Sequence, residues 1–233
     1  VMTAPNQGAA HATPTTALKG IDTANKLSIL SQFAFGKALD PNKLGIRGIE
    51  NITAAQLASA NHFGYTIKLL AIAKRLANKL YTFVGPALIA HNDPLAQVDG
   101  VQNAVAVESN ALRSSVYTGP GAGAKPTANS ILSDLAAAAN DILDYDCGSE
   151  FNNYHNELEP CSLTTVPQSY LVTTYGTSAK PNSTVNWQGE FSGNNYWSGL
   201  TPVISHQELE SLLKSFPKSS AVSYLPVYNT AKL

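Results

Sequence analysis

The sequence has no excess of charge of either sign and no long apolar run. Its 233 residues hold 15 Lys and Arg against 16 Asp and Glu, a formal charge of −1. Because this balance gives no net attraction to phosphate and no basic run appears, nucleic acids and anionic membrane surfaces are excluded as partners. The longest apolar stretches, such as 67–73, are far too short to cross a bilayer. The N-terminus lacks the basic region and apolar core of an export signal, so we expect a cytoplasmic protein.

Patterns that bind metal are also missing. The two cysteines, Cys147 and Cys161, lie in a polar segment without the four-ligand grouping that a zinc site needs. We expect two unpaired thiols, with a disulfide as the alternative only in an oxidising compartment. The other candidate ligands are scattered along the chain, so no metal site is expected; they are His62, His91, His155 and His206.

The first third of the chain predicts an arm followed by two helices. Residues 1–19 are rich in Ala, Thr and Pro and predict an irregular arm. Apolar residues then recur at helical spacing, which predicts an amphipathic helix over 20–35 that Gly36 ends. On that helix Asp22 and Lys26 are four residues apart and share one face. Thr53 and Gln56 form a capping box ahead of a second helix over 54–63.

The middle of the chain predicts a group of strands. The candidates are short, β-branched or aromatic segments between turn residues, at 44–49, 65–74, 80–84, 87–90, 101–107 and 112–118. A closing helix then continues to residue 143. This order predicts an α+β fold, a mixed β-sheet with helices on one face.

A glycine-rich turn precedes the closing helix. Gly119, Gly121 and Gly123 alternate within YTGPGAGAKPTANSILSDL (117–135), and Pro126 suits the first turn of a helix. Such a helix start, with free N–H groups, favours an anion. The alternative is a tight connection from strand to helix with no ligand, since neither GxGxxG nor a GK[ST] phosphate loop is present.

The C-terminal third predicts a linker and a small appendage. Residues 144–167 are polar and aperiodic, as in a linker. Strands are predicted at 169–175, 184–191 and 220–228, with a helix over 205–216 that Ser205 and Glu208 cap. This small α+β unit, 168–233, is near the lower size limit for independent stability, so we expect it to dock or dimerise.

Residues 8–143 resemble the substrate-binding half of homoserine dehydrogenases. The resemblance rests on the order and spacing of three segments: GIDTANKLSIL from Gly20, GYTIKLLAIAK from Gly64, and HNDPLAQVDGVQNAV from His91 leading into the glycine turn. It implies that 20–143 is a catalytic, substrate-binding and dimerisation domain. The tail, 168–233, resembles a shortened ACT-like regulatory module of the kind that follows this half in many relatives.

The resemblance implies NAD- or NADP-dependent interconversion of homoserine and aspartate semialdehyde, in threonine and methionine biosynthesis. Lys26 would be the catalytic proton-transfer group, Asp22 would bind substrate, and Gly119, Gly121 and Gly123 would touch the cofactor. A lysine that acts as a base needs burial, whereas a carboxylate one turn away favours its charged form. The resemblance also implies a homodimer formed through the sheet.

Two departures from the family pattern bear on activity. The family's arm reads like YAEADPTAD, with a glutamate and an aspartate for the substrate, where this chain has AAHATPTTA and so places His11 and Ala17 there. His11 remains a substrate-binding candidate, but it does not replace the charge of a carboxylate. The family also carries a Rossmann unit ahead of this half, which these residues do not include, so we expect the chain alone to be inactive. The alternative is a catalytically decayed amino-acid-binding or assembly module of the same fold.

Overall fold

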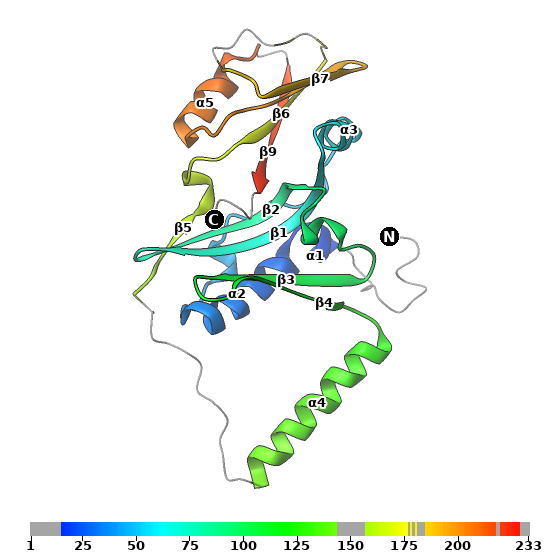
Figure 1. Ribbon diagram of the computed structural model, residues 1–233, viewed down its shortest axis with the longest axis vertical. Helices are drawn as coiled ribbons and strands as arrows, with labels where there is room; N and C mark the ends of the chain where they lie inside the picture. The colour runs from blue at the N-terminus through cyan, green and yellow to red at the C-terminus, as the bar shows by residue number, and fades with distance from the viewer. Residues whose placement is uncertain are drawn as a thin grey trace. The chain divides into compact units, whose positions relative to one another are not determined.

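The chain divides into two compact units in the computed structural model, which describes residues 15–143, 157–176, 178, 180, 185–217 and 220–228 (Figure 1). The larger unit combines Thr16–Asp93 with Asn152–Leu233, and the smaller combines Pro94–Phe151 with Val1–Thr15. The expected catalytic range, 20–143, therefore spans both units, while the expected C-terminal module belongs to the larger one.

Local signals set the helices of the larger unit, which are α1 Thr15–Leu18, α2 Ile21–Phe35, α3 Ala54–His62 and α5 His206–Ser215, with short 3₁₀ turns at Pro41–Lys43 and Leu163–Thr165. Gly36 ends α2 with φ of +64° and donates its N–H to the Gln32 carbonyl, as its position predicts. Both predicted capping boxes are present, one at Thr53 and Gln56 and the other at Ser205 and Glu208.

The larger unit contains a mixed sheet, which confirms the predicted α+β class. Its strands are β1 Tyr65–Leu76, β2 Lys79–Ala90, β5 Glu159–Ser162, β6 Tyr170–Tyr175, β7 Gly189–Gly193, β8 Tyr196–Leu200 and β9 Ala221–Tyr228. Their order is β1-β2-β9-β6-β8-β7, and β5 lies beside the first half of β2. β2 runs parallel to β5 and β9, whereas every other pair is antiparallel. The C-terminal strands therefore continue the sheet begun by β1 and β2.

The strand predictions were wrong in several details, and one is that β5 lies within the segment 144–167 that was predicted as a linker. The segments 80–84 and 87–90 are one strand, because Pro86 lies where neither β5 nor β9 pairs with β2 and its missing N–H breaks no ladder there. The segment 44–49 forms only an isolated bridge between Ile46 and Val84. The strand β8 was not predicted, since a glycine inside a strand weakens the sequence pattern. A Cβ at Gly199 would lie 2.5 Å from ring atoms of Trp187 and Trp197, so this glycine is needed for close packing within the strand.

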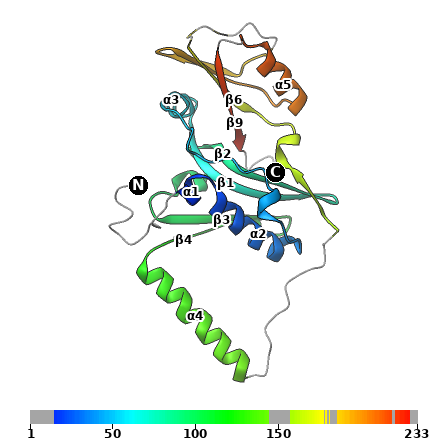
Figure 2. The same cartoon turned by 180° about the vertical axis from the view of Figure 1, so that it is seen from behind.

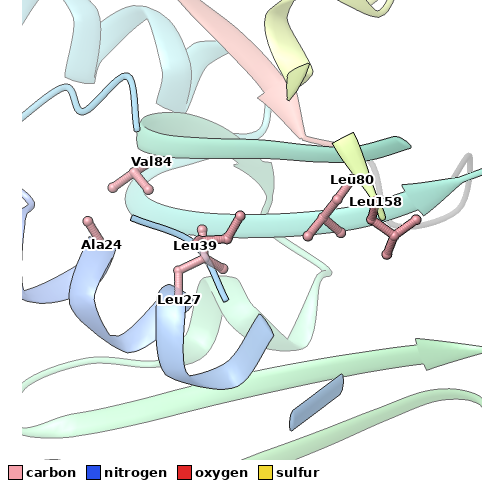
Figure 3. Close-up of a cluster of buried hydrophobic side chains, with 6 residues drawn as sticks. All are labelled: Ala24, Leu27, Leu39, Leu80, Val84 and Leu158. Carbon is pink, nitrogen blue, oxygen red and sulfur yellow. The ribbon is translucent and has the colours of Figure 1, made fainter. Parts of the chain in front are cut away.

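One hydrophobic core lies between α2 and the strands β1 and β2, because α2 runs along one face of these strands (Figure 1, Figure 2). Figure 3 shows its side chains: Ala24, Leu27, Leu39, Leu80, Val84 and Leu158. The members of this cluster come from α2, from the connection after it that contains Leu39, from β2 and from the residue just before β5, so segments far apart in sequence are joined by apolar burial.

The C-terminal strands carry helices on both faces. Leu171 of β6 packs with Ala60 of α3, whereas its neighbour Val172 packs with Leu209 and Leu212 of α5. Because successive residues of a strand point to opposite faces, α3 and α5 lie on opposite sides of β6. The expected arrangement, with helices on one face, therefore does not extend to this part of the sheet.

The smaller unit consists of a 3₁₀ turn at Pro94–Gln97, a hairpin of β3 Gln102–Ser109 with β4 Arg113–Pro120, and the helix α4 Ala124–Leu143. The hairpin confirms the two strands predicted at 101–107 and 112–118. α4 buries none of its residues. Within the part of the chain that the structure describes, no helix is both long and apolar enough to cross a membrane.

Candidate active site

The helix α2 presents the predicted pair Asp22 and Lys26. Its buried side chains include Ala24 and Leu27, which direct the opposite face outward. Lys26 Nζ lies 2.9 Å from Asp22 Oδ2, and the two side chains are 54% and 52% exposed, respectively. The structure thus brings these two predicted site residues together, on a surface that is open to a ligand.

The same geometry limits what the pair can do unaided. Both charged groups are about half open to water, which screens the ion pair between them. A lysine that acts as a base needs burial, and α2 itself does not supply it at Lys26.

The segment ahead of α2 has no polar side chain at Ala17, the position where the family pattern has an aspartate. Ala17 lies in α1 and is exposed, and its methyl group can accept no hydrogen bond from a substrate. The other arm candidate, His11, lies outside the described residues. Its role in substrate binding stays a prediction.

The three glycines of the predicted turn differ in their surroundings and in their backbone conformation. Gly119 belongs to β4, opposite Asn103, and a Cβ there would meet nothing within 4 Å. Gly121 donates its N–H to the Val101 carbonyl at 2.8 Å, and a Cβ at this position would overlap the Asn103 side chain. Gly123 has φ of +123°, a conformation that favours glycine, and α4 begins at the next residue.

The turn also has features that suit an anion. Pro126 lies in the first turn of α4, as predicted, and no acidic residue lies there, whereas Lys125 does. A helix N-terminus with a neighbouring cation favours negative charge. The turn belongs to the smaller unit and Lys26 to the larger one, so the contact of the glycines with a cofactor stays a prediction.

A cavity that sequence reasoning missed lies in the larger unit. Its volume is about 360 Å³, and its walls include residues of β1, β2, β8, β9 and the segment after β5, with Tyr65, Lys74 and Gln168 among the polar lining residues. None of the predicted site residues lines it. The sequence carried no signal for it, because its walls come from segments as far apart in sequence as Tyr65 and Tyr228.

No metal centre is found among the described residues, where no group of three or more His, Cys, Asp or Glu side chains converges. Cys161 is a half-buried free thiol in β5. Cys147 and His155 lie outside the described residues.

Comparison with known proteins gives this arrangement a family. The model of the homoserine dehydrogenase family matches residues 1–136. The homoserine dehydrogenase of Lactococcus lactis is 36% identical over 177 residues, which cover 76% of this chain and 40% of the relative. That of Pseudomonas aeruginosa is 43% identical over 128 residues, which cover 55% of this chain and 30% of the relative.

A solved structure extends the likeness over nearly the whole chain. The homoserine dehydrogenase of Thiobacillus denitrificans superposes with a TM-score of 0.81 at 26% identity, covering 98% of this chain and 57% of that one. The α+β fold and its superposition define the class of fold, which is that of the homoserine dehydrogenase structure. The chain belongs to the homoserine dehydrogenase family. It spans 30% to 40% of the length of the two curated relatives named above.

Proposed function

We propose that this chain supplies the substrate-binding and proton-transfer part of a homoserine dehydrogenase, which interconverts homoserine and aspartate semialdehyde in threonine and methionine biosynthesis. The observation that carries the proposal is the pair Lys26 and Asp22, held 2.9 Å apart on the open face of α2 in a chain of this family. A cytoplasmic location belongs to the same proposal.

The pair divides the chemistry of the alcohol between two groups. The Asp22 carboxylate attracts the ammonium group of an amino-acid substrate and orients its hydroxyl. Lys26, when neutral, accepts the proton that the hydroxyl loses during oxidation and returns it during reduction.

The cofactor proposed for this reaction is NAD or NADP, which when bound accepts the hydride of the alcohol carbon. The glycine turn suits an anionic dinucleotide, because Gly123 leads directly into the N-terminus of α4, whose first turn contains Lys125 and no acidic residue. The part of the cofactor site that distinguishes the two dinucleotides is assigned to the family's Rossmann unit.

The exposed helix α4 supports a partner domain of that kind. Its large apolar side chains are each more than half exposed: Ile131, Leu132, Leu135, Ile142 and Leu143. A stripe of this size is normally covered in a folded protein. Because the matched relatives are more than twice as long as this chain's match to them, we assign the cover to their nucleotide-binding part.

A second candidate function is favoured by Ala17. The family pattern places an aspartate for substrate at this position, and the exposed methyl group of Ala17 offers no acceptor in its place. A decayed module that binds an amino acid or assembles with other chains, without turnover, would keep the fold and lose this group.

Two assembly proposals accompany the function. A homodimer would form through the sheet, using strands between Leu80 and Thr118, and sedimentation showing only monomer at micromolar concentration would contradict it. The C-terminal strands would form an ACT-like regulatory module. The order β6, β7, β8, α5, β9 supports this, since it follows a ferredoxin-like β-α-β-β-α-β pattern except that no helix appears in the described residues between β6 and β7.

The test joins this chain to the nucleotide-binding part of the Lactococcus lactis relative and follows reduced nicotinamide with homoserine as substrate. We expect turnover by the joined protein and negligible turnover by the 233-residue chain alone. Robust turnover by the chain alone would contradict the proposed division of the site. If the joined protein is inactive, and His11→Glu with Ala17→Asp restores activity, the decayed module is the better description.

A further inference from the structure

The segment Ile46–Ile49 is held tightly against the start of α2. A Cβ at Gly20, the residue that precedes α2, would lie 3.1 Å from Ile46 Cγ2. At Gly48, a Cβ would lie 2.6 Å from the Leu18 carbonyl oxygen. That carbonyl also accepts the N–H of Ile49 at 2.9 Å. Two glycines and a backbone hydrogen bond therefore fix this segment to the turn that joins α1 and α2.

The same segment is also held by β2. The Arg47 N–H donates to the Val84 carbonyl at 2.9 Å, beside the bridge between Ile46 and Val84. A Cβ at Gly85 would lie 3.2 Å from Arg47 Cβ, so the strand approaches the segment closely only because this residue is glycine. The backbone of Arg47 is thus clamped between the start of α2 and the middle of β2.

The side chain of Arg47 makes a third connection, to the C-terminal part of the sheet. Its Nη2 donates a hydrogen bond to Tyr224 Oη, and its guanidinium carbon lies 4.7 Å from the centroid of the same ring. Tyr224 belongs to β9 and packs edge-on against Tyr170 of β6, with ring centroids 5.9 Å apart. Tyr224, which is 177 positions away in sequence, therefore contacts the segment Ile46–Ile49 through the side chain of Arg47.

We propose that Arg47 is a positioning residue, through which the C-terminal strands hold the first turn of α2, the turn that contains Asp22. The contacts run without a break from Tyr224 to Arg47, from Arg47 to Ile46 and Gly48, and from these to Gly20 and Leu18. A change in β9 would displace Asp22 more than Lys26, because Lys26 lies one turn further along the helix from the contacts at Gly20. The kinetic consequence depends on the proposed function, whereas the structural one does not.

The structural test uses amide hydrogen exchange in the whole 233-residue chain. Tyr224→Phe removes the acceptor for Arg47 and keeps the ring, so it should raise exchange about fivefold at the amides of Gly20, Ala24 and Ile49. Tyr175→Phe is the matched control, since its hydroxyl bonds Thr53 and Ser223 instead. Unchanged exchange in Tyr224→Phe, or the same change in the control, would overturn the proposal.

A second measurement separates positioning from general loosening. In the joined enzyme, Tyr224→Phe and Arg47→Met should each raise the homoserine KM about fivefold with kcat within twofold, and the double variant should do no more than either. Arg47→Lys, which keeps a cationic donor, should recover part of the loss. Additive effects in the double variant would overturn the proposal. If the unsubstituted joined enzyme is inactive, the proposed function fails and the exchange result alone decides this inference.

Discussion

Lys26 Nζ lies 2.9 Å from Asp22 Oδ2, and about half of each side chain remains open to solvent. An exposed pair of this kind contributes little to folding, about 0 to 1 kcal/mol, because water screens both charges. The pair can therefore be altered without loss of the fold, which allows its chemistry to be tested separately from stability.

Substituting Lys26 should remove activity and spare the fold. In the joined enzyme, Lys26→Met should lower kcat about 10²- to 10⁴-fold, the range expected for loss of a general acid or base. The free energy of urea unfolding of the chain should change by less than about 1 kcal/mol. Lys43→Met is the control, since Lys43 also pairs with an exposed carboxylate of its own segment, Asp40 at 3.8 Å. Equal loss of activity in both variants would contradict the assignment of Lys26.

The glycine turn offers a matched pair of substitutions. Gly121→Ala should destabilise the smaller unit, because its Cβ would overlap the Asn103 side chain, whereas Gly119→Ala should be neutral because nothing lies within 4 Å. The Asn103 side chain has to move to make room for the new methyl group, so we expect the free energy of unfolding to fall by about 1 kcal/mol. Adding Asn103→Ala to Gly121→Ala should recover the stability in thermal unfolding. Equal costs at the two glycines would show that the close approach is unimportant.

Buried hydroxyl groups join α3 to the C-terminal strands. Ser59 of α3 donates to Ser198 Oγ at 2.8 Å, and Thr173 Oγ1 lies 3.0 Å from the same oxygen. All three residues are fully buried. Removing the shared partner by Ser198→Ala would leave two hydroxyls with fewer partners, which should cost about 1 to 3 kcal/mol of unfolding free energy.

The control for Ser198→Ala is Ser211→Ala. Its hydroxyl is exposed on α5 and donates to the Gln207 carbonyl at 2.8 Å, so water replaces the lost bond. Its unfolding free energy should stay within about 0.5 kcal/mol of the parent chain. A cost for Ser211→Ala as large as that for Ser198→Ala would mean that the buried network does not join α3 to the strands.

Features set by residues close together in sequence were predicted correctly, whereas features set by distant residues were not. Helices α2, α3 and α5 were predicted closely because Gly36 and the two capping boxes act within a few residues of each other. The pair on α2 was predicted for the same reason, since its members are four residues apart. Such signals need no knowledge of the fold.

Features that depend on distant segments were not predicted. The prediction split β2 into two strands at Pro86. A proline is accepted at this position because neither β5 nor β9, both more than 70 residues away, pairs with β2 there. The contact of Arg47 with Tyr224 and that of Ser59 with Ser198 join positions 177 and 139 apart. Neither spacing nor periodicity within a segment carries information about such pairs.

The cap of α5 makes part of the stability depend on acid pH. The Glu208 carboxylate accepts the Ser205 N–H at 2.7 Å and the Ser205 hydroxyl at 2.8 Å. The bond from the backbone N–H is the main cause that lowers the pKa of Glu208 below its ordinary value of 4.5, and the hydroxyl bond adds to it. A carboxyl group whose pKa is lower in the folded state stabilises the fold above the unfolded value and loses that contribution as pH falls through the folded one.

The chain should therefore lose stability as pH falls from about 4.5, and Glu208→Gln should remove this part of the loss, because glutamine can accept the same bonds without titrating. The measurement is urea unfolding followed by circular dichroism between about pH 3 and 6 for the parent chain and for the variant. The unfolding curves should differ most at the upper end of this range and converge at the lower end. Glu159→Gln, on a carboxyl of β5 that caps no helix, is the control and should leave the pH dependence in place. A difference between the parent chain and Glu208→Gln that stays constant across the range would show that the cap does not titrate with folding.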